Sequence, residues 1–209
     1  MSRGRLEIFS DAVFAVAITL LALNLAIPGP GHGPLAGQLA HQWQPFVAYL
    51  ISFFTIGVVW VNHHALVSGF TVVTRSLLFL NLVLLLFVVL IPVATKLLAE
   101  YLTLSGFGAH LAAAVYGMVG EGSSASFILI LEWALREGRM QSPVPPDRRR
   151  VARLRFYLGP MTYLLVIGAA FINPLLALGL SGAIDVYYIF EQTPTMVRGI
   201  ARPDNADDG

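Results

Sequence analysis

Six long apolar runs divide this chain and restrict it to one broad class of fold. A bilayer core about 30 Å thick is crossed by a helix of roughly 20 predominantly apolar residues. In lipid, a helix satisfies all of its own backbone polar groups. The sequence therefore predicts an all-α membrane protein with six transmembrane helices, near 6–27, 45–67, 76–98, 108–134, 153–172 and 175–191.

Composition supports this class of protein. Of the 209 residues, 56% are hydrophobic and 12% are charged, against roughly 45–50% and 25% in soluble domains. The chain has no cysteine, which excludes disulfides and thiolate metal ligands. It also has no HExxH, GxSxG or P-loop motif. We therefore expect no enzymatic activity and no cofactor, and we expect no nucleic-acid partner.

The distribution of basic residues predicts the orientation in the membrane. If the N-terminus is cytoplasmic and there are six spans, twelve arginines fall on the inside and only Lys96 falls outside. The positive-inside rule then places both chain ends in the cytoplasm. The turn-rich segment PGPGHGPLAG (28–37) becomes an external loop. We expect a multi-pass protein of an inner or plasma membrane.

The predicted organisation is one membrane domain followed by a short tail. The six-helix domain covers 1–193 and includes a basic cytoplasmic loop at about 136–152, and a disordered cytoplasmic tail covers 194–209. The arginine run of the loop is interpreted first as a topology determinant. Binding of anionic lipid headgroups or of an acidic partner is the alternative.

Polar residues gather at the predicted cytoplasmic ends of the first three spans. An ionisable group in a span is costly unless it is paired or faces water, so we expect a hydrogen-bonded layer there. Asp11 should accept a hydrogen bond from His63, His64 or Asn81, and carbonyls or aromatic rings should hold Arg5. The layer includes Arg5, Ser10 and Asp11 of the first span, Trp60, Asn62, His63 and His64 of the second, and Arg75 and Asn81 of the third.

This layer has two interpretations. One is that it only holds three helices together. The other is that protonation of a histidine within it controls how readily the protein opens, since histidine titrates near neutral pH. A metal site is not expected at the pair His63 and His64. Neighbouring side chains on a helix diverge by about 100°, and no third ligand stands at a matching spacing.

A stripe of residues with helical spacing runs along the first span. Its members cover about 100° of the helix, and they are Ala12, Val16, Thr19, Leu20, Leu23 and Ile27. Such a stripe by itself is more typical of helix packing. A threonine in a transmembrane helix commonly bonds back to its own backbone, here to the carbonyl of Ala15.

The segment that opens the first span resembles a known family. The pattern R-x-x-x-F-S-D, formed by Arg5, Phe9, Ser10 and Asp11 and followed by AVFAVAITLLAL, resembles the signature of transmembrane protein 175, the endosomal and lysosomal potassium channel family. WVNHH (60–64) and TRSLLFLNLVLLLFVVLIPVATKLL (74–98) resemble the same family. The resemblance implies six helices per repeat and, for a prokaryotic chain with one FSD, a homotetramer.

The same resemblance implies where the pore lies. In that family the first helix lines the pore, and its large apolar residues form the constriction. By position after FSD, these are Val16, Leu20 and Leu23, with Thr19 as the polar residue near the narrow part. No TVGYG-like carbonyl filter is present. A potassium-permeable channel of modest selectivity is therefore expected.

Two acidic residues of the later spans are not explained by this resemblance. Glu121 lies in GEGSSAS (120–126), whose small residues suit helix contact, and it is either hydrogen-bonded there or a proton-sensing carboxylate. Asp185 in the last span raises the same question. Both residues would be coupling carboxylates in the alternative function, a proton-coupled secondary transporter, although no inverted repeat is evident.

Overall fold

The regular secondary structure of the described residues is helical, as the sequence predicts. A computed structural model describes residues 2–23, 25, 28–102, 104, 106–136, 138–141 and 144–190. Within these ranges there are seven helices: α1 (Arg3–Ala22), α2 (Leu35–His41), α3 (Trp43–Ser68), α4 (Arg75–Leu102), α5 (Phe107–Ala134), α6 (Pro146–Ile172) and α7 (Pro174–Phe190). The predicted tail at 194–209 lies outside the described residues.

Six of these helices coincide with the six predicted apolar runs. Among the described helices, α3, α4, α5 and α6 are long and apolar enough to cross a membrane, and α7 is a shorter apolar helix. Helix α1 is less apolar because Arg5, Glu7 and Asp11 lie in its first half. The additional helix, α2, begins after the extended residue Pro34, so the predicted external loop ends in a short helix.

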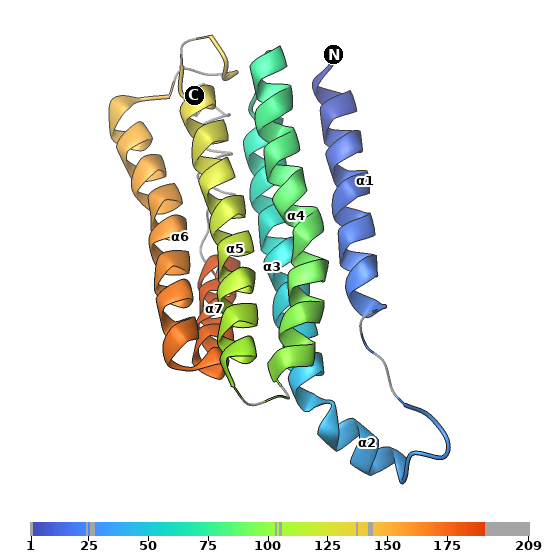
Figure 1. Cartoon of the computed structure of the whole chain (residues 1–209). Coiled ribbons are helices and arrows are strands. Elements are labelled where there is room, and N and C mark those ends of the chain that lie inside the picture. The colour runs from blue at the N-terminus through green and yellow to red at the C-terminus, as the bar shows by residue number, and fades with distance from the viewer. Residues whose placement is uncertain are drawn as a thin grey trace, which may run out of the picture.

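The six longer helices pack side by side, and α2 lies at the end of the bundle away from the N-terminus (Figure 1). Helix α1 packs on α3 and α4, whereas α6 packs on α5 and α7. The core between α4 and α5 connects the two groups. Consequently α1 and α6 lie on opposite sides of the bundle (Figure 1).

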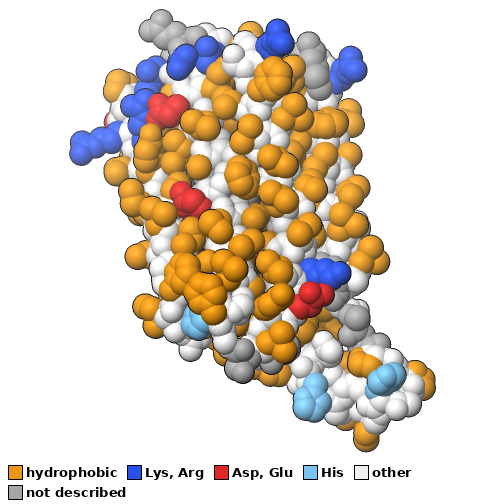
Figure 2. Space-filling model, in the orientation of Figure 1, with side chains coloured by type: hydrophobic (Ala, Val, Ile, Leu, Met, Phe, Trp, Pro, Cys, Tyr) orange, Lys and Arg blue, Asp and Glu red, His pale blue; other side chains and the backbone are white. Residues whose placement is uncertain are grey.

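Charged side chains mark one end of the bundle. Figure 2 shows most of the visible Lys and Arg side chains at the end where α1 begins, above a largely hydrophobic surface. Lys96 lies in the last turns of α4, beside Glu100 at 3.9 Å, and so belongs to the opposite end. The asymmetry read from the sequence therefore corresponds to a spatial separation of basic residues.

Close approach at two glycines explains how α5 packs in the centre. Gly120 lies against the ring of Tyr163 on α6, and Gly122 lies against the ring of Phe87 on α4. A Cβ atom at either glycine would collide with the neighbouring ring. The small residues of GEGSSAS therefore serve helix contact, as small residues do in membrane helices.

The basic segment 136–152 is partly helical. Its first part pairs with the turn after α3, since the Thr71 amide donates to the Arg139 carbonyl at 3.0 Å and the Gln141 amide donates to the Gly69 carbonyl at 3.0 Å. Helix α6 then begins at Pro146, with Asp147 in its first turn. Proline suits the first helical position and an acidic residue suits the positive end of the helix dipole.

Candidate functional site

Helix α1 has two faces of different character. One face is buried against α3 and α4 and consists of Leu6, Ser10, Phe14, Ala17 and Leu21. These positions follow the spacing of a single helix face. The buried face fixes the rotation of α1 about its axis, and with it the direction of the opposite face.

The opposite face carries the stripe that the periodicity predicted. Val16 is 56% exposed, Leu20 is 39% exposed and Leu23 is 78% exposed, although all three are large apolar residues. Thr19 and Ala12 are also exposed, and Ile27 lies outside the described residues. In the single chain this stripe is left uncovered, so it is directed at lipid or at other copies of the chain.

The backbone partner predicted for Thr19 is wrong by one position. Its hydroxyl donates to the carbonyl of Val16 at 2.8 Å, not to that of Ala15. Both carbonyls are within reach of a threonine side chain in a helix, and its rotamer selects between them. The bond holds the hydroxyl close to the helix while the residue stays exposed.

A buried hydrogen-bond network joins α1, α3 and α4 near the end where α1 begins. The Asn81 amide donates to the Ser10 hydroxyl at 3.0 Å, and the Asn81 carbonyl oxygen lies 2.8 Å from His63 Nε2. The Ser10 hydroxyl also donates to the Leu6 carbonyl at 2.9 Å. All three side chains are at most 1% exposed. The predicted polar layer is thus present and centred on Asn81.

The predicted partner of Asp11 is wrong. Asp11 accepts a hydrogen bond from the indole nitrogen of Trp60 at 2.8 Å, not from His63, His64 or Asn81. The amide of Asn81 is already shared between Ser10 and His63. Asp11 is turned about 100° away from Ser10 around the helix, so it meets α3 at a different residue. His64 is exposed, and its ring lies 6.1 Å from that of Trp60.

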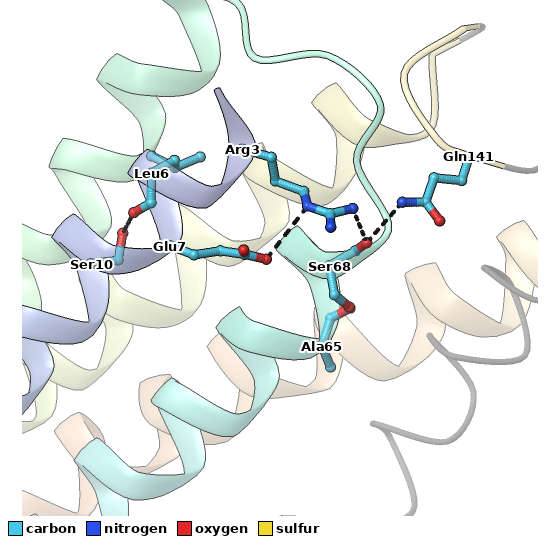
Figure 3. Close-up of polar contacts among 7 residues, drawn as sticks. All are labelled: Arg3, Leu6, Glu7, Ser10, Ala65, Ser68 and Gln141. Atoms are coloured by element: carbon cyan, nitrogen blue, oxygen red, sulfur yellow. Dashed lines mark hydrogen bonds and ion pairs between the residues drawn. The ribbon is translucent and has the colours of Figure 1, made fainter. Parts of the chain in front are cut away.

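Arg3, rather than Arg5, attaches the start of α1 to the rest of the chain. Arg5 is exposed and forms no ion pair in the described part of the protein. The arginines placed over aromatic rings there are Arg75 and Arg139, which corrects the expectation that a ring holds Arg5. Figure 3 shows Arg3 reaching from α1 to the Ser68 carbonyl, to which it donates at 2.9 Å. Arg3 also pairs with Glu7 at 3.7 Å, and Gln141 donates to the same carbonyl at 3.2 Å.

Sequence reasoning did not identify Arg3 or Gln141. Arg3 precedes the recognised motif, and Gln141 lies in a loop far along the chain, so neither carried a signal in pattern or spacing. Trp60 was placed in the layer but not assigned to Asp11. Phe9, the aromatic of the motif, is 48% exposed and lies beside the stripe rather than in the network.

Asp185 lies in a separate polar cluster on the other side of α3. It is 4% exposed and accepts a hydrogen bond from Thr55 at 2.6 Å. It lines a cavity of about 60 Å³ between α3, α5, α6 and α7, to which Asn62 and Arg155 also contribute. A cavity of that size has room for water beside the carboxylate. This cluster lies apart from the exposed stripe of α1.

The carboxylate of Glu121 is not fully hydrogen-bonded, which differs from the first interpretation of this residue. Its Oε2 atom is buried without a hydrogen-bond partner in the described part of the chain. The glycines on either side approach aromatic rings instead of polar groups. Within the same ranges, no group of three or more His, Asp or Glu side chains is placed to hold a metal ion.

An all-helical bundle with apolar outer surfaces, basic residues at one end and an uncovered stripe on its first helix defines a multi-pass membrane protein. The model of the family "endosomal/lysosomal potassium channel TMEM175" matches residues 5–92. A potassium channel of Streptomyces collinus is 42% identical over 202 residues, which cover 96% of this chain and 98% of that protein.

The structural comparison agrees with these sequence matches. The crystal structure of a lysosomal potassium-selective channel TMEM175 homolog from Chamaesiphon minutus superimposes with a TM-score of 0.79 and 32% identity, over 91% of this chain and 97% of that one. The human endosomal/lysosomal proton channel TMEM175 is 36% identical over 103 residues, 45% of this chain and 20% of that protein.

This chain belongs to the endosomal/lysosomal potassium channel TMEM175 family, and within it to the prokaryotic members. The resemblance carried by Arg5, Phe9, Ser10 and Asp11 is thereby confirmed. The relatives are ion channels and not enzymes.

Proposed function

We propose that this protein is a potassium-permeable, modestly potassium-selective channel formed by four copies of the chain around a central pore. In this arrangement α1 lines the pore, six helices of each chain cross the cell membrane, and both chain ends are cytoplasmic. One observation carries the proposal. Helix α1 is locked to α3 and α4 by a buried polar network, yet it turns a continuous row of large apolar side chains away from its own bundle.

Four copies of α1 would convert this row into rings of side chains. Rings of Val16, Leu20 and Leu23 would form the constriction, because an apolar ring can gate an aqueous pore by dewetting. A ring of Thr19 hydroxyls would offer weak oxygen ligands to a partly hydrated cation. Selectivity should be modest, because no carbonyl filter replaces the hydration shell of the ion.

The polar layer would hold the pore helix in register. Ser10, Asn81 and His63 fix the rotation of α1 through buried hydrogen bonds, and the bond from Trp60 to Asp11 ties the same turn to α3. In this proposal Arg5, Phe9 and His64 remain at the cytoplasmic mouth of the pore, where all three are exposed. His63 is the titratable member of the buried layer, and Glu121 and Asp185 are the proposed proton-sensing carboxylates outside it.

Ion flux through purified protein in liposomes tests the channel directly. With a potassium gradient and no pH gradient, we expect potassium flux that exceeds sodium flux severalfold. The competing function, a proton-coupled transporter, would use the buried carboxylate of Asp185. Flux that requires an imposed proton gradient and disappears in Asp185→Asn would refute the channel and support the transporter.

Replacement of Thr19 by valine should reduce selectivity without closing the pore. The variant keeps the shape of the side chain but removes the hydroxyl ring, so the ratio of potassium to sodium permeability should fall toward one. Thr162→Val is the matched control, because the Thr162 hydroxyl also donates to a carbonyl three residues earlier, at 2.7 Å. The measurement is the ratio of potassium to sodium permeability of each variant, obtained from reversal potentials. An unchanged ratio in Thr19→Val would remove Thr19 from the pore.

A further inference from the structure

An open groove lies beside the first turns of α6. Its volume is about 510 Å³, and its lining combines basic and apolar residues: Pro146, Arg149, Arg150, Arg153, Leu154 and Tyr157. None of these residues belongs to the pore stripe or to the polar layer. Figure 2 shows basic side chains gathered at this end of the bundle, directly above a hydrophobic surface.

The positive charge of the groove is only partly balanced. Arg153 forms a bidentate pair with Glu132, at 2.7 Å for both bonds. Arg149 donates through Nε to the Val144 carbonyl at 2.8 Å, which orients its guanidinium group. Neither Arg149 nor Arg150 forms an ion pair with another residue in the described part of the chain. Two guanidinium groups are therefore left to attract an anion.

The apolar side of the groove continues along the membrane-facing surface of α6. Leu154, Leu158, Met161 and Leu165 follow Arg150 at the spacing of one helix face, with exposed fractions of 62%, 46%, 61% and 69%. Tyr157 is 44% exposed beside them, and tyrosine is typical of the boundary between headgroups and lipid tails. A ligand with a charged head and an apolar tail matches this surface.

The position of α6 in the bundle indicates lipid as its surroundings. Helix α6 packs on α5 and α7, on the side of the bundle away from α1 (Figure 1). If α1 lines a central pore, as the proposed function holds, α6 lies at the periphery of the tetramer. The groove then opens to the cytoplasmic leaflet of the membrane, where anionic lipids reside.

We propose that this groove binds the phosphate group of an anionic phospholipid. Arg149 and Arg150 donate hydrogen bonds to the phosphate oxygens, since guanidinium groups match phosphate geometry in a bidentate manner. An acyl chain lies along the exposed leucine and methionine face of α6. Arg153, which is paired with Glu132 of α5, lines the groove beside those two arginines.

Binding of short-chain phosphatidylglycerol to the full-length protein in detergent tests the site. Isothermal titration should show that phosphatidylglycerol binds at least tenfold more tightly than phosphatidylcholine of the same chain length or inorganic phosphate. The double variant Arg149→Gln, Arg150→Gln should weaken phosphatidylglycerol binding at least tenfold, because it removes both guanidinium groups that would donate to the phosphate oxygens.

The matched control is Arg148→Gln. It removes one positive charge from the same turn of α6, half of what the double variant removes, but Arg148 does not line the groove. A loss of binding free energy in the control that is half of the double variant's or more would overturn the site and leave only general electrostatic attraction. An unchanged affinity in the double variant would also overturn it, and inorganic phosphate binding as tightly as the lipid would overturn the lipid assignment.

A second variant tests the apolar part of the groove. Leu158→Asn should weaken phosphatidylglycerol binding severalfold and leave the binding of inorganic phosphate unchanged. No loss for the lipid would contradict the proposed path of the acyl chain. These measurements contain no ion flux, so a failure of the lipid site and a failure of the proposed channel function give separate results.

Discussion

Liposomes that contain the Val16→Asn variant should conduct potassium about tenfold faster than liposomes with the unchanged protein. A ring of valines excludes water from a narrow pore, whereas a ring of amides stays wet. A tenfold increase in rate corresponds to a barrier lowered by about 1.4 kcal/mol. The measurement is potassium flux at equal amounts of protein, with sodium as the comparison ion.

Val186→Asn provides a matched control for this experiment. Val186 on α7 is 54% exposed, almost the same as the 56% of Val16, and α7 packs on α3, α5 and α6 rather than lining the proposed pore. The control should leave potassium flux unchanged. If both variants conduct like the original protein, or if both increase flux equally, the stripe on α1 is not the constriction.

Replacement of Asn81 by leucine should destabilise the protein more than other substitutions among the polar residues of the first three long helices. The variant leaves Ser10 and His63 buried without their shared partner, and an unsatisfied buried polar group costs about 1–3 kcal/mol. Ser10 still donates to the Leu6 carbonyl, so His63 is the group left unsatisfied and the expected loss is about 1–3 kcal/mol. The unfolding midpoint of purified protein in detergent, followed by tryptophan fluorescence, reports this loss.

Asn62→Leu is the control for the Asn81 experiment. Asn62 is also an asparagine in this part of the bundle, but among the described residues its amide donates to the carbonyl of Val58 alone, within its own helix, at 2.9 Å. Its replacement should lower the midpoint much less. Equal shifts for the two variants would show that the network through Asn81 adds no specific stability. If Asn81→Leu still folds but loses potassium selectivity, the network through Asn81 positions α1.

Much of the architecture could be predicted from local sequence. The six apolar runs reappear as α1 and α3 to α7 because burial of apolar length in a bilayer and helix formation are set by stretches of neighbouring residues. The extra helix α2 was missed because a seven-residue helix after a proline-rich turn has too few residues to show a period. The start of α6 at Pro146 was missed for a related reason, since charged residues hid its first turns.

The polar contacts show where such reasoning fails. The sequence placed Asp11, Trp60, His63 and Asn81 at one depth, because depth follows from counting residues along each helix. The hydrogen-bond partner predicted for Asp11 was wrong, because the partner depends on the rotation of each helix against its neighbours. That rotation is set by packing over the whole length of α1, α3 and α4.

The sequence by itself determined the class of the protein, its family and the row of residues that α1 turns away from its own bundle. These depend on composition, on a short motif and on the 3.6-residue period. Only the tertiary structure decided that Asn81 joins Ser10 to His63 and that Arg3, not Arg5, ties α1 to α3. It also decided that Arg149 and Arg150, which form no ion pair among the described residues, share a groove with apolar side chains. Side chains from distant segments meet only when the helices are packed, and their rotation and offset are then set by the core as a whole.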